Sequence, residues 1–287
     1  MVAQQHRRKG GTVALAAVLG AMAVGGCSAG VSGPADGRPR LDTVQGQAGQ
    51  VADGRSDEVR TAADRLIAAG SARTRTSMET AAGGTRVTIR GEGGYDFTRR
   101  EGRLTVVLPK DPAGMEARRP VTELMTPGAL YMKNRGAGVP ADKWVRVDTT
   151  TLEDGNLVTG GATDPLAAAE LLRSARNVVY LGEETLDGAT VRHYRGDADI
   201  ARAALAAEPH ARASLAAAAK GFARDAVPFE AYLDERGRLR KVLHRFTFTN
   251  GGGTVEVAST TLLYDFGAPV VVRLPDRRDI YAGKIRG

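Results

Sequence analysis

The chain has one cysteine, Cys27, and its thiol is the side chain whose setting most directly indicates a chemistry. A disulfide within the chain is excluded, because a bridge needs two thiols. Cys27 follows a cationic segment, 6–9, and an uncharged run, 10–26, whose apolar part is about a dozen residues long. Such a run has the length of the apolar region of a signal peptide and is too short to span a bilayer comfortably. The pattern therefore predicts an exported chain.

The residues directly before the cysteine, Val24-Gly25-Gly26, resemble the lipobox of bacterial lipoproteins. The resemblance implies cleavage before Cys27 and attachment of a diacylglyceryl group to its sulfur through a thioether. Acylated Cys27 would then hold the protein in membrane lipid on the extracytoplasmic face of the cell membrane. Two alternatives stay open: a plain secretory signal that is cleaved nearby, and an uncleaved anchor.

Other residue types with catalytic or ligand chemistry show no arrangement that predicts a site. The histidines beyond the signal, His193, His210 and His244, lack the spacing of metal ligands. The sequence contains no nucleophile elbow, P-loop, dinucleotide fingerprint, H-E-x-x-H motif or paired cysteines. We expect no enzymatic activity, catalytic residue, metal or cofactor. The formal charge falls from +7 to +4 when residues 1–26 are removed, which is too small to favour nucleic-acid binding.

Composition divides the chain into a signal peptide, 1–26, a lipidated cysteine with a flexible tether, 27–55, and one folded domain, 56–287. The tether is rich in small and polar residues and has a reach of about 30 Å. The domain is expected to begin with a helix that Ser56 caps and Gly70 ends. Its apolar residues, at positions 59, 63, 66 and 67, have helical spacing.

Period-two alternation over 85–148 predicts an antiparallel meander. Val87 and Ile89 share one face of a strand, and Leu104, Val106 and Leu108 share a face of the next. The glycines at 91, 93 and 94 are expected to permit bulges and kinks that curl the sheet. Trp144 and Val145 point to opposite faces of a later strand.

The pattern then changes to helix, with Asp164 as N-cap, Pro165 at the first position and an end near Ser174. A hairpin turning at Asp187-Gly188 follows. The Ala-rich segment 199–221 is predicted to be helical with a break at Pro209, and we expect it to act as a lid. Three strands complete the domain; Phe229 lies on the first, and Phe246 and Phe248 share a face of the second.

Three segments, beginning "DPLAAAELLRSARNVVYLGEETLDG", "VPFEAYLDERGRLRKV" and "YDFGAPVVVRLP", resemble the LppX/LprG-type lipoproteins of actinobacteria, which share the LolA-like fold. The segment "DKWVRVD" after a "YMK" strand resembles them too, and the likeness extends over about 56–274. It implies an α+β fold, with a curved antiparallel sheet, or half-barrel, and helices covering its concave face. It also implies an apolar cavity that holds lipid acyl chains.

The resemblance makes binding or carriage of a lipid or other amphiphile the expected function. The alternation of side chains along the predicted strands indicates ten candidates for residues that line this cavity: Val87, Ile89, Leu104, Val106, Leu108, Trp144, Val145, Phe229, Phe246 and Phe248. Two alternatives remain open. The same apolar faces are required for a filled core, with Trp144 as a structural anchor instead of a residue at the cavity mouth. A regulatory or scaffold lipoprotein that binds an envelope protein partner would share this architecture.

Overall fold

The computed structural model describes residues 54–82, 85–108, 119–135, 138–158, 163–222, 226–250 and 253–283. Every described residue belongs to one compact unit of the chain. Cys27, the predicted signal peptide and the tether up to residue 53 lie outside the described residues.

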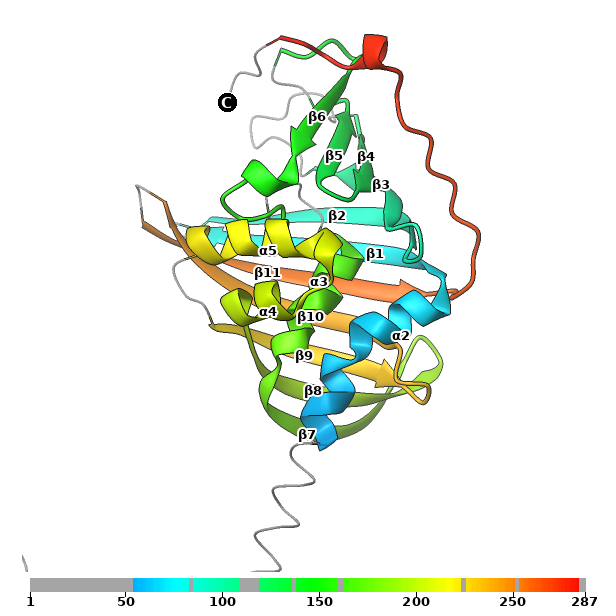
Figure 1. Cartoon of the computed structure of the whole chain (residues 1–287), viewed down its shortest axis with the longest axis vertical. Coiled ribbons are helices and arrows are strands. Elements are labelled where there is room, and N and C mark those ends of the chain that lie inside the picture. Colours follow the sequence, from blue (N-terminus) through cyan, green and yellow to red (C-terminus); the bar gives the residue numbers. More distant parts are fainter. Residues whose placement is uncertain are drawn as a thin grey trace, which may run out of the picture. The chain divides into compact units, whose positions relative to one another are not determined.

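One antiparallel sheet forms the body of this unit, and its strand order is β6-β5-β4-β3-β2-β1-β11-β10-β9-β8-β7 (Figure 1). Two meanders, β1–β6 and β7–β11, join where the first strand pairs with the last. The strands are β1 (Ser71–Ala82), β2 (Thr85–Asp96), β3 (Glu101–Val107), β4 (Val121–Thr126), β5 (Ala129–Lys133), β6 (Trp144–Asp148), β7 (Arg176–Leu186), β8 (Ala189–Asp199), β9 (Ala226–Asp234), β10 (Leu239–Asn250) and β11 (Gly253–Tyr264).

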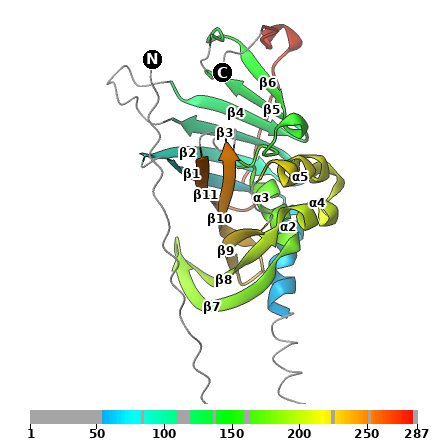
Figure 2. The ribbon, with the colours of Figure 1, turned by 90° about the vertical axis from the view of Figure 1, so that its left-hand side faces the viewer.

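The helices lie on one side of the sheet, and the sheet bends around them (Figure 2). They are α2 (Ala62–Ala69), α3 (Pro165–Leu171), α4 (Ile200–Ala206) and α5 (Pro209–Gly221), with short 3-10 turns η1 (Thr149–Thr151), η2 (Leu172–Ser174) and η3 (Arg277–Asp279). Helix α3 and the turn η2 belong to the crossover between the edge strands β6 and β7. Helices α4 and α5 instead lie in the connection between β8 and β9. The predicted α+β class, a curved antiparallel sheet covered by helices, is confirmed.

Local signals in the sequence account for the helix ends after β6. Oδ1 of Asp164 accepts hydrogen bonds from the backbone N–H groups of Leu166 (2.8 Å) and Ala167 (3.1 Å), as expected of an N-cap. The predicted break separates α4 from α5, with Pro209 at the start of α5. Gly221 is the last residue of α5, where a Cβ atom would lie 2.1 Å from the carbonyl oxygen of Glu153.

Two local expectations are wrong. Ser56 does not cap the first helix, because residues 54–60 are already helical and Ser56 is a buried residue within that turn. The glycines of β2 do not form a bulge, because β2 pairs with β3 in unbroken register. Gly93 instead permits close contact, since a Cβ atom there would lie 1.9 Å from the carbonyl oxygen of Arg103.

The segment after β11 runs back to the edge strand β6 (Figure 1). Ile280 forms a parallel bridge with Trp144, and the backbone N–H of Tyr281 donates to the Trp144 carbonyl at 2.8 Å. Lys143 Nζ donates to the carbonyl of Arg278 at 3.0 Å. Among the described residues, this segment covers the β6 edge, whereas β7 pairs only with β8.

Candidate functional site

The inner face of the sheet holds most of the side chains that alternation selected for a cavity. Leu104, Val106, Val145 and Phe229 each expose 2% or less of their surface and belong to one apolar cluster, which we call cluster A. Helices α2 and α3 supply the other wall of cluster A. The structure thus brings together four candidates that come from three strands distant in sequence, β3, β6 and β9.

Other candidates lie apart from them. Phe246 is buried in a second apolar cluster, cluster B, which contains residues of α4 and α5. Ile89 and Leu108 pack against cluster A but are only partly buried, and Val87 is 37% exposed.

Trp144 lies on the opposite face of the sheet from Val145, as its alternation predicts. It is paired with Lys133, whose Nζ lies 5.7 Å from the centroid of the indole ring. The structure therefore does not bring Trp144 together with the inner-face candidates. The side chain of Phe248 and the whole of Cys27 lie outside the described residues.

A band of buried polar side chains separates clusters A and B. It consists of cross-strand pairs, Thr76 with Thr261 and His244 with Ser259, on the inner face of β1, β11 and β10. Ser259 Oγ lies 2.6 Å from Thr163 Oγ1, which itself donates to a backbone carbonyl. Thr76 Oγ1 and His244 Nε2 have no hydrogen-bond partner among the described residues. Burial lowers the pKa of His244 to about 3, so the imidazole is neutral at physiological pH.

Glu123 is a buried acid that the sequence analysis missed. It faces the interior from β4, between Leu104 on β3 and Met132 on β5, and is 1% exposed. Desolvation raises its pKa to about 8, against a smaller opposing effect of Arg135. The sequence could have indicated this burial, because Glu123 alternates with Val121 and Met125 in "VTELMT" and so lies on the same face of the strand as these apolar residues.

Helices α4 and α5 cover cluster B mainly with small side chains. Their buried alanines are Ala203, Ala204, Ala211 and Ala218, joined by Ala207 in the linker. Ile200 and Leu215 are the large buried side chains that these helices contribute. Leu205, the other large aliphatic side chain of this helical segment, is 81% exposed.

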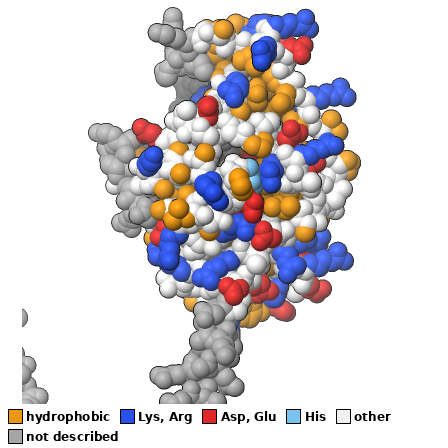
Figure 3. All heavy atoms as spheres, viewed as in Figure 1, with side chains coloured by type: hydrophobic (Ala, Val, Ile, Leu, Met, Phe, Trp, Pro, Cys, Tyr) orange, Lys and Arg blue, Asp and Glu red, His pale blue; other side chains and the backbone are white. Residues whose placement is uncertain are grey.

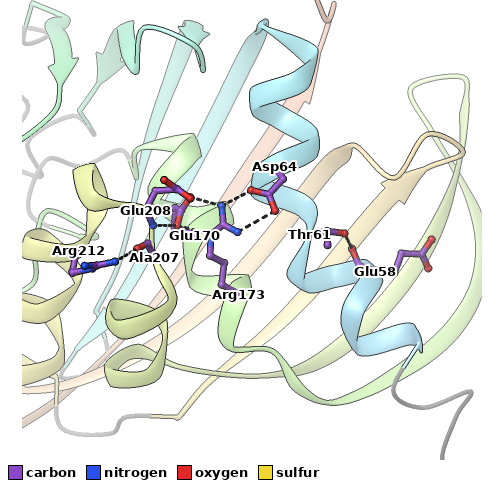
Figure 4. Close-up of polar contacts among 8 residues, drawn as sticks. All are labelled: Glu58, Thr61, Asp64, Glu170, Arg173, Ala207, Glu208 and Arg212. Carbon is purple, nitrogen blue, oxygen red and sulfur yellow. Dashed lines mark hydrogen bonds and ion pairs between the residues drawn. The ribbon is translucent and has the colours of Figure 1, made fainter.

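A polar clamp fastens this layer to the helices beside it (Figure 4). Arg173 binds Glu170 through Nε (2.8 Å) and Nη2 (3.0 Å), and binds Asp64 of α2 through Nη1 (3.1 Å) and Nη2 (2.6 Å). Oε2 of Glu170, whose side chain is fully buried, also accepts from the backbone N–H of Glu208 at 3.1 Å. The clamp therefore ties α2, α3 and the α4–α5 linker to one buried carboxylate.

A cavity of about 50 Å³ lies beside the clamp, where α5 meets the β4–β5 turn and the loop before α3. Its apolar wall includes Met125 and Leu166 of cluster A and Leu215 of cluster B. Tyr95 and Asp164 contribute a polar wall, in which the tyrosine hydroxyl donates to Asp164 Oδ2 at 3.0 Å. Burial is the main cause that raises the pKa of both groups.

Comparison with known proteins finds similar solved structures at low sequence identity. No family model matches the chain, and no curated protein matches it. Lipoprotein LppX of Mycobacterium tuberculosis is 11% identical, with a TM-score of 0.47, over 77% of this chain and 99% of that one. LprF of Mycobacterium bovis is 12% identical, with a TM-score of 0.39, over 78% of this chain and 97% of that one.

The MucA/MucB complex of Pseudomonas aeruginosa is 14% identical, with a TM-score of 0.32, over 80% of this chain and 61% of that one. LppX is one of the two lipoproteins after which the family resembled by the sequence is named.

In the part of the chain that the structure describes, no helix is long and apolar enough to cross a membrane. The same residues contain no group of three acidic, histidine or cysteine side chains placed to hold a metal ion.

Proposed function

We propose that this protein is a lipoprotein, anchored by acylated Cys27 outside the cell membrane, that binds a lipid or other amphiphile between the sheet and helices α4 and α5. It carries its ligand without catalysing a reaction. Helices α4 and α5 form the separable wall of the site, and cluster B is the apolar surface that receives the acyl chain.

The observation that carries this proposal is the small size of the side chains by which α4 and α5 contact the sheet. A fully buried Leu or Ile side chain contributes about 1.5 to 3 kcal/mol, whereas a single buried methyl contributes about 0.8 kcal/mol. Two large helix side chains, Phe222 at the C-cap of α5 and several alanines therefore hold this layer less strongly than cross-strand pairing holds the sheet. Separation of the layer exposes the aromatic side chain of Phe246 and the aliphatic side chains of Val227 and Val257.

The size of the cavity indicates that the described conformation is the closed one. Ligand pockets usually enclose about 300 to 1,000 Å³. The cavity between the helices and the sheet, at about 50 Å³, is too small for an acyl chain. Binding must therefore displace α4 and α5, and each methylene that then contacts cluster B offsets this cost by about 0.8 kcal/mol.

The polar clamp gives this displacement a pivot. Glu170, which Arg173 binds, holds the α4–α5 linker through the backbone N–H of Glu208. Asp199, the N-cap of α4, donates its own backbone N–H to Ser174 Oγ at 2.9 Å. Both attachments lie at the α3 side of the layer.

Organic extraction tests the proposal. The full-length Cys27→Ser protein, which carries no covalent lipid, is purified and extracted with chloroform and methanol, and the extract is quantified by mass spectrometry. We expect about one lipid per chain. A yield no higher than that from a soluble control protein taken through the same purification would refute lipid carriage.

Binding of a protein partner is the second candidate function, and the β7 edge favours it. Val179 and Leu181 lie two residues apart on this edge strand and are 48% and 44% exposed. An extended segment of a partner could pair with this edge. Over the helices, by contrast, apolar side chains are interspersed with basic and acidic ones (Figure 3). If the extract contains no lipid and a partner protein is captured through β7, the results would favour partner binding over lipid carriage.

A further inference from the structure

Basic side chains gather where the edge strand β6 meets the segment after β11, at a part of the domain that we call the basic end. Its cations are Arg119, Lys133, Arg135, Lys143, Arg146, Arg277 and Arg278. Lys143 Nζ donates to the carbonyl of Arg278 at 3.0 Å, and Asn134 Nδ2 donates to the carbonyl of Pro120 at 3.2 Å. These two bonds hold η3 and the residues before β4 beside the β5–β6 hairpin.

Most cations of the basic end have no acidic partner. Arg278 pairs with Asp276 at 3.3 Å, and the other six cations form no ion pair with any described residue. Five of the seven are exposed: Arg119, Arg135, Arg146, Arg277 and Arg278. The described residues of this end include four carboxylates: Asp142, Asp148, Asp276 and Asp279. The basic end therefore has a net positive charge at neutral pH.

Aromatic rings lie among these cations on the outer face of β5 and β6. Lys133 Nζ is 5.7 Å from the centroid of the Trp144 ring, and Arg146 Cζ is 6.0 Å from that of Tyr131. Both are cross-strand pairs of the β5–β6 ladder. Trp144, the only tryptophan of the chain, is half-buried and points away from the inner face. Trp and Tyr are enriched where proteins meet the membrane–water interface, because their rings are apolar and carry a polar group.

The arrangement of these groups suits an extended anionic surface better than a single anion. The cations come from β5, β6, η3 and the residues before β4, so they are spread over the surface and do not surround one point. Leu274, three residues before η3, is 47% exposed and adds an apolar side chain to this surface. Anionic head groups attract Lys and Arg, while aromatic and aliphatic side chains enter the head-group layer.

We propose that the basic end docks the domain on the anionic phospholipid surface of the membrane. This contact is additional to the proposed lipid carriage and does not depend on it. Trp144 and Leu274 enter the head-group layer, and the surrounding Lys and Arg side chains bind lipid phosphates.

The position of the basic end is compatible with the proposed anchor at Cys27. Arg55 Cζ lies 5.8 Å from the ring centroid of Tyr180 on β7, so the described chain begins at the edge of the sheet opposite to β6 (Figure 1). Eleven strands about 4.8 Å apart make the sheet about 50 Å wide. Residues 27–53 can extend to about 90 Å, so an anchored chain is long enough for β6 to reach the same membrane.

Vesicle binding tests the proposal, with Trp144 as the reporter. The full-length Cys27→Ser protein, which carries no covalent lipid, is mixed with vesicles of phosphatidylcholine alone or of phosphatidylcholine with phosphatidylglycerol. Part of the phosphatidylcholine is brominated close to the head group, because bromine quenches a tryptophan that it contacts. We expect sedimentation to show at least about tenfold stronger binding to the anionic vesicles, weakened by added salt. We also expect the brominated lipid to quench Trp144 in the anionic vesicles.

A pair of double variants tests the location of the contact. Arg277→Gln with Arg278→Gln should weaken binding to the anionic vesicles at least about tenfold, because each cation near such a surface contributes about fivefold. Arg195→Gln with Arg236→Gln is the matched control, since it removes the same charge from exposed positions on β8 and in the β9–β10 turn. This control should bind as the wild type does. Equal weakening in both double variants would show that total charge, and not the basic end, causes binding.

Other outcomes would also overturn the proposal. Equal binding to neutral and anionic vesicles would contradict an electrostatic contact, and anionic binding without quenching of Trp144 would place the contact on another face. Alginate, a soluble acidic polysaccharide, would replace the membrane as the partner if it changed Trp144 fluorescence as much as the anionic vesicles do. Lipid extraction keeps the two proposals separate, because the Arg277→Gln, Arg278→Gln protein should yield as much lipid per chain as its parent.

Discussion

Glu123 and His244 both project from the sheet into the interior, and burial shifts their pKa values in opposite directions. Each shift favours the neutral form: Glu123 has a pKa of about 8 and His244 of about 3. The unfolding free energy falls as pH drops from 6.5 towards 3, because His244 then binds a proton in the unfolded chain but stays neutral in the folded one. It also falls as pH rises from 4.5 to about 8, because folded Glu123 keeps a proton that the unfolded chain loses.

Glu123→Gln should remove the second of these dependences. Between pH 4.5 and 8 the wild-type unfolding free energy should fall by up to about 1.4 kcal/mol per pH unit from this residue, and the variant should lack that contribution. Urea unfolding at pH 5 to 9 measures the difference. Glu183→Gln, at an exposed position on β7, is the control and should match the wild type. A Glu123→Gln profile parallel to the wild type would contradict the buried, protonated state.

Replacing a buried residue by a larger one should show whether its side chain lies where the ligand binds or in a part of the core that the ligand does not reach. Val106 lies in cluster A and Val227 in cluster B, and each is 1% exposed. Trp at either position should cost about 1 to 3 kcal/mol of stability, because both clusters are filled in the closed conformation. Val227→Trp should also weaken binding of a fluorescent fatty-acyl probe at least about tenfold, whereas Val106→Trp should not. Equal losses of probe binding in both variants would contradict the assignment of cluster B.

At the scale of elements, the helical layer and the sheet differ in how they are held. Strand β10 has a neighbour on each side, β9 and β11, and its inner face carries large buried side chains. Helices α4 and α5 have two large buried anchors between them. Local opening of the layer should therefore cost less free energy than global unfolding.

Hydrogen exchange measures that difference directly. Backbone amides of α4 and α5 should exchange at least about tenfold faster than those of β10 between Val242 and Phe246, under conditions in which the protein stays folded. Addition of a bound amphiphile should change exchange in the layer more than in the sheet. Equal protection of the layer and of β10 would show that α4 and α5 are a fixed part of the core.

At the scale of the whole molecule, sequence patterns predicted the meanders, helix α3 and the later helical segment with its break, because those features have local signals. Asp164, Pro209 and the Asp187-Gly188 turn carry such signals. Strand β1 was missed, although it lies at the centre of the sheet. Its inner face presents Ala72, Thr74, Thr76 and Met78, which lack the large apolar alternation that identifies a strand.

The candidate site was predicted only in part, for a related reason. Alternation identifies which residues share a face, as it does for Leu104 and Val106, but it does not show which face is the inner one. It cannot show which helix covers which strand, because that depends on pairing between distant segments. The division into two clusters, the clamp at Arg173 and the cavity beside it all arise from such pairing.

Membrane attachment should depend on Cys27 and leave the domain unaffected. Cys27→Ser should shift the protein from the membrane fraction to a soluble or uncleaved pool, with an unchanged thermal unfolding midpoint, because the residue lies outside the described domain. Fractionation and immunoblotting measure the shift. Equal membrane retention of mature-sized wild type and variant would refute the lipid anchor.

Photochemical labelling tests the central claim, that an acyl chain lies between the sheet and α4–α5, most directly. The full-length protein is irradiated with a fatty acid that carries a diazirine in its chain, and the labelled residues are mapped by mass spectrometry. We expect labels on four members of cluster B, Val227, Phe246 and Val257 on the inner face and Leu215 on α5, and loss of these labels when unlabelled fatty acid is in excess. Labels confined to exposed residues, or labels that excess fatty acid does not displace, would contradict it.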